Sequence, residues 1–305
     1  MQYVSEEVSA RLASHELAYD AVKKALIAAS ESAAIFPVVL GHGSDPSNTY
    51  AVKSSAVADL AGLKVGSFWP GNGARGEPRH NSLILLFDQT CGRISAAVEA
   101  GKLNAYRTAA ANAVAAQQLA RQDAKTLAIF GAGHQAEYEV RAIARVRDLQ
   151  KVLVVTRNSA KGQRFVADLQ TDGINAELAE GEAACRAADI IVTVTPTRAP
   201  LFQADWVQPG THVASMGSDS TGKQELPPEL FDRARLFCDL PAQSRVIGEF
   251  QHAAEGADLT AIGDVLSGRA AGRTSAQQIT VFDSSGLSVQ DLYVAQAILA
   301  LVADG

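Results

Sequence analysis

Several features that would indicate nucleic-acid, membrane or export chemistry are missing from this 305-residue sequence. It has no run of lysine and arginine and its net charge is −6, which excludes a surface that follows nucleic-acid phosphates. No apolar stretch approaches the length of a membrane span. The N-terminus lacks the uninterrupted apolar core of a signal peptide. We therefore expect neither a nucleic-acid nor a membrane partner.

Cysteine is also scarce. The three cysteines, Cys91, Cys185 and Cys238, are widely spaced and form no CxxC pair. This pattern favours reduced thiols in a cytoplasmic protein over a disulfide or a zinc site, so no metal is expected. With 47% hydrophobic and 20% charged residues, the composition is that of a globular protein with a sizeable core.

The pattern of apolar and turn-forming residues changes twice along the chain. In residues 34–98, short apolar and β-branched runs separated by Gly, Pro, Asn and Asp predict a mostly antiparallel sheet. An alanine-rich helix, YRTAAANAVAAQQLAR, is long enough to bridge two domains. From residue 125 onward, apolar strands alternate with helices, which indicates a parallel sheet buried on both faces. We predict an α/β protein with a Rossmann-type NAD(P)-binding domain (116–278) and a discontinuous α+β domain for substrate and dimerisation (1–115 with 279–305).

The segment KTLAIFGAGHQA carries a dinucleotide-binding pattern. Gly131 and Gly133 follow an apolar strand directly, Ala136 takes the third small position, and a helix follows. The first glycine allows a tight turn, the second lets the pyrophosphate approach, and the helix N-terminus offers free N–H groups. The strand–turn–helix setting makes a dinucleotide site the better interpretation than an ordinary small-residue turn.

The end of the next strand bears on the choice of cofactor. An NAD site usually has an acidic residue there, but this sequence reads KVLVVTRNS. Thr156, Arg157 and Asn158 supply a cation and donors for a 2′-phosphate, which favours NADP(H). NAD(H) stays open, because a surface arginine stacked over adenine would tolerate both cofactors.

Two basic residues outside the predicted nucleotide domain suggest an anionic ligand. Lys64 lies in a predicted strand, and Arg107, followed by Thr108, begins the alanine-rich helix. A cation at a helix N-terminus is mildly unfavourable, so a bound anionic ligand would explain why Arg107 occurs at this position. The alternative is that both are ordinary surface cations.

Taken in order, KVGSFWPGN, YRTAAANAVAAQQLA, IFGAGHQAEYEV, GSDSTGKQEL and VFDSSGLSVQDL resemble the ornithine cyclodeaminase/mu-crystallin family. The pattern is most similar to the imino-acid reductase branch, which includes iminosuccinate reductases. The resemblance implies a homodimer formed through the first domain, to which the C-terminal helix returns. It also implies reactions that pass through an imine beside a nicotinamide.

The resemblance assigns roles to particular residues. It implies that Lys64 and Arg107 bind the substrate carboxylate and that Asp219, with Lys64, is catalytic. Asp219 would hold or deliver a proton at the imine nitrogen, because hydride attack on C=N needs an iminium. The expected cofactor-binding residues are Thr108, Gly131, Gly133, His134, Gln135, Thr156, Arg157, Asn158, Thr195 and Met216.

One departure from the family pattern concerns the first sheet, where many members carry another arginine. No arginine occurs between Arg11 and Arg75. Lys53 or His42 would take that role, and we expect Lys53 to bind substrate. A second carboxylate could be held near Arg75, Arg79 and His80. The alternative is that these three residues lie on a surface loop.

The resulting hypothesis is an enzyme that reduces a small 2-imino acid with NAD(P)H, or oxidatively deaminates the amino acid in reverse. Two alternatives stay open. One is an ornithine- or lysine-type cyclodeaminase that recycles bound NAD+. The other is a mu-crystallin-like protein that binds NADPH or a small ligand without turnover.

Overall fold

The computed structural model describes residues 1–304, and their contacts divide the chain into two compact units. The first unit contains residues 1–107 and the C-terminal stretch from Leu287, and the second contains residues 108–286. The sequence-based division had assigned 108–115 and 279–286 to the first domain. The second of these differences has a clear cause, because the strand at 279–283 pairs within the parallel sheet of the second unit.

The first unit is built on a mostly antiparallel sheet, as the short apolar runs and frequent turn residues of 34–98 predict. The strand order is β1-β7-β6-β5-β4-β2, with β3 pairing to β4, and only the β1–β7 pair is parallel. The strands are β1 (Gln2–Val4), β2 (Ala34–Ile35), β3 (Val39–His42), β4 (Thr49–Ala56), β5 (Ala61–Phe68), β6 (His80–Phe87) and β7 (Ile94–Glu99).

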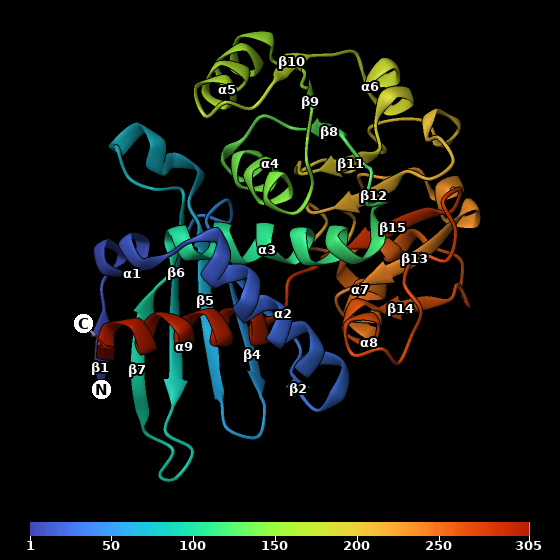
Figure 1. The fold of residues 1–305 in the computed structure, drawn as a ribbon. Helices are drawn as coiled ribbons and strands as arrows, with labels where there is room; N and C mark the ends of the chain where they lie inside the picture. Colours follow the sequence, from blue (N-terminus) through green and yellow to red (C-terminus); the bar gives the residue numbers. More distant parts are fainter. Residues whose placement is uncertain (305) are drawn as a thin grey trace. The chain divides into compact units, whose positions relative to one another are not determined.

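Two long helices lie across one face of this sheet (Figure 1). Helix α9 (Ser288–Asp304) packs on β4, β5 and β6, and α2 (His15–Glu31) packs on α9. The short α1 (Glu6–Leu12) precedes α2, whose first turn is capped by Ser14, because the hydroxyl accepts a hydrogen bond from the Leu17 N–H at 3.1 Å. This layer buries Val22, Leu26 and Ile298 completely.

The second unit is an eight-stranded sheet in the order β10-β9-β8-β11-β12-β15-β13-β14. All of its strand pairs are parallel. The strands are β8 (Thr126–Phe130), β9 (Lys151–Val155), β10 (Ala176–Leu178), β11 (Ile190–Thr193), β12 (His212–Ser215), β13 (Ala234–Cys238), β14 (Leu259–Ala261) and β15 (Ile279–Asp283). The connecting helices include α4 (His134–Val146), α5 (Ser159–Thr171), α6 (Gly181–Ala187), α7 (Pro241–Ile247) and α8 (Ile262–Leu266). The central strands β8 and β11 are almost entirely buried, which explains their near-continuous apolar sequences, whereas β12 and β15 also bury polar side chains such as His212 and Asp283.

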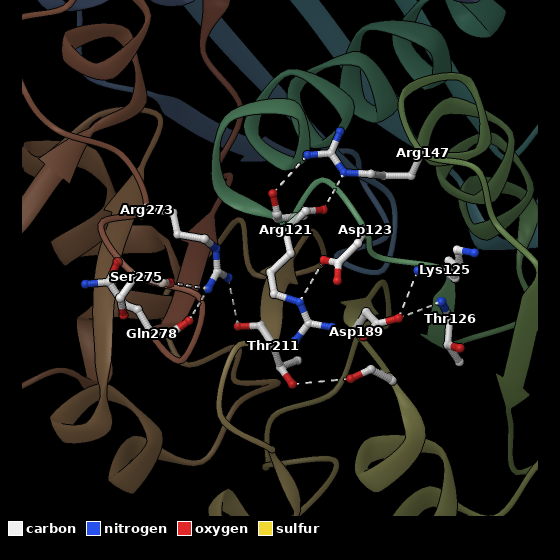
Figure 2. Close-up of polar contacts among 12 residues, drawn as sticks. Arg121, Asp123, Lys125, Thr126, Arg147, Asp189, Thr211, Arg273, Ser275 and Gln278 are labelled. Atoms are coloured by element: carbon white, nitrogen blue, oxygen red, sulfur yellow. Dashed lines mark hydrogen bonds and ion pairs between the residues drawn. The ribbon is translucent and has the colours of Figure 1, made fainter.

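Helix α3 (Gly101–Leu119) ends at a cluster of arginines in the second unit, drawn in Figure 2. Arg147 donates to the carbonyl oxygens of Ala116 and Ala120, each at 2.9 Å, and Arg273 donates to that of Leu119. The Ala116 carbonyl also accepts the Ala120 N–H, while Leu119 and Ala120 lie where a helix end leaves carbonyls without an intrahelical partner, and the guanidinium groups supply donors to them. The C-terminal end of α3 is thereby fixed. Across residues 1–304, no helix has the length and apolar character needed to cross a bilayer.

Candidate functional site

The glycine turn lies between β8 and α4, at the carboxyl end of the parallel strands. Gly131 has a φ of +124°, and a Cβ there would lie 2.9 Å from the carbonyl oxygen of Val194, so only glycine fits this turn. Gly133 precedes α4, and no side chain caps the helix. Around a Cβ built on Gly133, the one nearby heavy atom is Lys161 Nζ at 3.9 Å. The turn is therefore open for a close backbone approach by a phosphate group.

The two residues after the turn differ in their surroundings. His134 is exposed, and its ring packs edge-on against Tyr138. Gln135 donates to the buried carboxylate of Glu139 at 2.8 Å, and Asn112 donates to the other oxygen of that carboxylate at the same distance. The side chain of Gln135 therefore belongs to a buried hydrogen-bond network, while His134 remains accessible.

The loop after β9 presents the three predicted cofactor-selecting residues. Arg157 is exposed, and within residues 1–304 its side chain forms no hydrogen bond or ion pair. The side-chain oxygen of Asn158 accepts from the Lys161 N–H at 3.0 Å and caps α5. The hydroxyl of Thr156 accepts from the Asn158 N–H at 3.4 Å. The loop is thus held in place by Thr156 and Asn158, and Arg157 is the side chain left to meet a ligand.

The loop that follows β12 carries Met216 and Asp219. Met216 is buried, whereas the side chain of Asp219 is 56% exposed. Lys223 Nζ lies 2.5 Å from Asp219 Oδ1. Asp219 is therefore an accessible carboxylate with an ammonium partner, at the carboxyl edge of the sheet where nucleotide-binding folds place their ligands.

The first unit brings together the three predicted substrate-binding cations. Lys53 and Lys64 are register partners on β4 and β5, so their side chains share one face of the sheet. Lys64 Nζ donates to Asn104 Oδ1 at 2.9 Å and to Asp291 Oδ1 at 3.0 Å. Arg107 Nε also lies 3.1 Å from Asp291 Oδ1. This cluster is a buried cationic site with one carboxylate of its own.

The environment of Lys64 changes its protonation. Lys64 is 5% exposed, and burial, followed by the charge of Arg107, lowers the pKa of its amine to about 7. The Asp291 carboxylate acts in the opposite direction, and Lys53 adds a smaller lowering effect. An amine that titrates near neutrality can both hold an anion and exchange a proton.

The other predicted basic residues of the first unit are at the surface. Arg75, Arg79 and His80 are all exposed. The His80 ring packs on Phe68, with 4.6 Å between centroids. His42 is exposed, and its Nδ1 contacts the Gly43 carbonyl oxygen at 2.7 Å. None of these residues has the burial that marks Lys64 and Arg107.

Comparison with known proteins agrees with this architecture. The family model of the ornithine cyclodeaminase/mu-crystallin family matches residues 2–304. The chain belongs to this family. It is 38% identical over 310 residues to the iminosuccinate reductase of Paracoccus denitrificans, covering 99% of this chain and 96% of that protein.

Two solved structures of family enzymes show how closely the fold is shared. An archaeal alanine dehydrogenase dimer with bound NAD superposes with a TM-score of 0.92 at 31% identity, over 100% of this chain and 97% of that one. The Thermococcus litoralis Δ1-pyrroline-2-carboxylate reductase with NADH and L-proline gives 0.91 at 26% identity, over 100% and 98%. The predicted Rossmann-type fold with a second α+β domain is confirmed.

The sequence analysis missed the buried carboxyl groups, and two of them, Glu225 and Asp291, lie next to predicted site residues. Glu225, in the motif GSDSTGKQEL, accepts hydrogen bonds from both the N–H and the hydroxyl of Thr195, at 2.6 and 2.8 Å. Its other oxygen accepts from the Gly217 N–H at 2.8 Å. Glu225 therefore ties the ends of β11 and β12 together, and the hydroxyl of Thr195 is committed to that contact.

The second missed group is Asp291, the counter-ion of Lys64 and Arg107. It lies in VFDSSGLSVQDL, which contributed to the recognition of the family, but no local pattern distinguishes it from a solvated helix residue. Its burial depends on the packing of α9 against the sheet of the first unit.

Proposed function

We propose that this protein reduces a 2-imino acid to the corresponding amino acid with a nicotinamide cofactor, and catalyses the reverse oxidation. The observation that carries the proposal is the buried pair of Lys64 and Arg107. The ammonium of Lys64 has three hydrogens and donates two of them, to Asn104 and Asp291. It therefore keeps one donor for a substrate carboxylate.

The guanidinium of Arg107 has further donors to offer. Nε and Nη2 donate to Asn104 Oδ1, and Nη1 donates to Gln290 Oε1. Each terminal nitrogen carries a second hydrogen, and among residues 1–304 no other acceptor takes it. A planar pair of such donors suits a carboxylate, and a clamp of this kind orients the neighbouring C=N bond.

The second unit has the features that a dinucleotide requires. The open position at Gly133 and the uncapped start of α4 fit a pyrophosphate, and the first turn at Gly131 accepts no Cβ. Gly131, Gly133 and His134 would hold the cofactor there, with Arg157 at the adenosine ribose. The cofactor, when bound, supplies the hydride that adds to the imine carbon.

Reduction of the imine also consumes one proton, which must reach the nitrogen. A neutral C=N group accepts hydride poorly, so a protonated iminium is the reactive form. We assign this proton to the carboxyl group of Asp219, which is accessible and sits after a late strand of the sheet. Lys223, its ammonium partner, would hold the carboxylate in place once the proton has left.

A coupled assay distinguishes this function from its alternatives. Consumption of NADPH or NADH in the presence of a 2-oxo acid and ammonia or methylamine is expected for an imine reductase. Release of ammonia from ornithine with no net change in nicotinamide absorbance would instead identify a cyclodeaminase. Cofactor binding without turnover of any imine would identify a binding protein and refute the proposal.

We further propose a preference for NADPH, which rests on Arg157. This guanidinium is exposed and uncommitted after β9, where it can meet a 2′-phosphate. The two structures compared above carry NAD or NADH, so the preference has to be measured directly. Equal kcat/KM for NADH and NADPH, or an Arg157→Ala variant with unchanged NADPH affinity, would contradict it.

For the substrate, the charges of the site favour a 2-imino dicarboxylate. Three cationic side chains, Lys53, Lys64 and Arg107, lie in the same unit as the carboxylate of Asp291, which contacts Lys64 and Arg107. A site with several cationic side chains favours a substrate with two carboxylates over one with a single carboxylate. The relative from Paracoccus denitrificans is named for such a substrate. Faster reduction of cyclic or pyruvate-derived imines than of iminosuccinate would overturn this assignment.

We also propose a homodimer formed through the first unit and a cytoplasmic location. Phe36, Val39 and Leu40 are 49%, 60% and 65% exposed around β2 and β3, and Tyr50 on β4 is 39% exposed. Exposed apolar residues gathered in this way mark an interaction surface. Light scattering should give twice the mass of 32.0 kDa. A monomer at micromolar concentration would contradict the dimer, and Leu40→Glu should weaken it.

A further inference from the structure

Asp291 is a buried carboxylate with an unusual set of partners. It is 1% exposed on α9, and its Oδ1 contacts Lys64 Nζ at 3.0 Å and Arg107 Nε at 3.1 Å. Its Oδ2 is buried with no hydrogen-bond partner among residues 1–304. A carboxylate buried for structural reasons normally has both oxygens satisfied. The contacts of Asp291 are instead confined to the two cations assigned to the substrate.

Without an anion, these two cations would destabilise each other. Both are nearly excluded from water, so their repulsion is weakly screened. Lys64 is the group that can relieve it by losing its proton, because a guanidinium does not deprotonate in proteins. The other groups that face Lys64 are the side chain of Asn104 on α3 and the like charge of Lys53 on β4. Asp291 is therefore the negative charge available to the site before a substrate arrives.

We propose that Asp291 is a positioning residue that strengthens proton binding by Lys64 and aligns its side chain with Arg107, so that the carboxylate clamp carries more positive charge in the free enzyme. This inference rests on the proposed function for the identity of the ligand. Its electrostatic part concerns the free protein alone. The shared contact at Oδ1 brings the ammonium and the guanidinium to one atom, which preorganises both for a carboxylate.

The direct test is a pH titration of Lys64 by NMR, with the side-chain nitrogens of lysine labelled and the Lys64 signal assigned through Lys64→Arg. In the parent protein the midpoint should lie near the pKa of about 7. Asp291→Asn should lower it by at least about one pH unit, which is a tenfold change in proton affinity. Asp20→Asn removes an exposed carboxylate from α2 of the same unit and should leave the midpoint unchanged.

Two results would overturn the proposal. One is an unchanged Lys64 midpoint in Asp291→Asn. The other applies if Asp291→Asn does not fold. Asp291→Glu keeps the charge and should hold the midpoint near that of the parent, so a fall of more than about one pH unit would show that the charge is not responsible.

The pH profile of kcat/KM gives a second readout. At about pH 8, Asp291→Asn should be about tenfold less active than the parent, since its Lys64 is deprotonated over a wider range. Near pH 5 both proteins carry a charged Lys64, and the difference should shrink to about twofold or less. A loss of equal size at every pH would indicate a structural role. Absence of imine reduction in the parent would refute the proposed function, while the NMR titration would still decide the role of Asp291.

Discussion

Replacing Glu225 with glutamine tests whether this carboxyl group holds the carboxyl ends of β11 and β12 together. One of its oxygens accepts the Thr195 N–H at 2.6 Å, and the other accepts the Gly217 N–H at 2.8 Å. Glutamine has nearly the same shape, but its nitrogen accepts no hydrogen bond. Whichever way the amide lies, one backbone N–H that points at this buried position loses its acceptor.

The expected decrease in the free energy of unfolding follows from the loss of that one hydrogen bond. An unsatisfied buried donor costs about 1–3 kcal/mol, so Glu225→Gln should lower the free energy of unfolding by about 2 kcal/mol. Burial raises the pKa of Glu225, and the prediction holds for either protonation state, because a carboxyl group in both forms keeps an acceptor at each oxygen. Urea unfolding followed by circular dichroism measures the change.

The matched control is Glu229→Gln, because Glu229 is an exposed carboxylate of the same unit. It should change the unfolding free energy by less than about 0.5 kcal/mol. If Glu225→Gln were as stable as this control, the five donor contacts around Glu225 would not hold the strand ends together.

Three further predictions concern other parts of the chain. Gly133→Val should weaken cofactor binding by about tenfold or more while the protein stays folded, because the valine side chain would fill the space left for the pyrophosphate. A fluorescence titration measures this affinity, and an unchanged value would contradict the assignment of the glycine turn to the pyrophosphate. Arg147→Ala should lower the free energy of unfolding by about 3 kcal/mol, since it removes the buried donor to the carbonyls of Ala116 and Ala120 at the end of α3. Arg164→Ala, at an exposed position on α5, should have almost no effect on this free energy. Because the pKa of Lys64 is lowered to about 7 in the folded protein, the unfolded chain binds more protons above that pH. Stability should therefore rise between about pH 7 and 10, and Lys64→Met should remove this rise; an unchanged slope would show that Lys64 titrates normally.

Much of this fold can be predicted from short sequence patterns, because the residues that determine each element lie next to one another in the chain. The apolar strand, the two glycines and the helix at 125–146 form one continuous unit, and the turn at Gly131 allows no side chain. The capping of α2 by Ser14 can likewise be predicted from the residues that follow it directly in the sequence.

The missed features depend on pairing across long stretches of chain. The segment ITVFD has the composition of any buried strand, and nothing in it indicates insertion between β12 and β13. Glu225 and Asp291 occur in sequences typical of a loop and a helix. Their burial depends on contacts with residues such as Glu249 and Lys64, which lie far away in the chain. Charged residues are expected at the surface unless such partners are known.

The central claim is that this chain reduces an imine with a proton supplied by Asp219. The most direct measurement compares NADPH- or NADH-dependent reduction by the parent, Asp219→Asn and the exposed control Asp205→Asn, alongside the cofactor affinity of each. We predict that Asp219→Asn loses about a hundredfold or more in kcat with cofactor affinity within about twofold, and that Asp205→Asn matches the parent. A fully active Asp219→Asn enzyme would contradict the account.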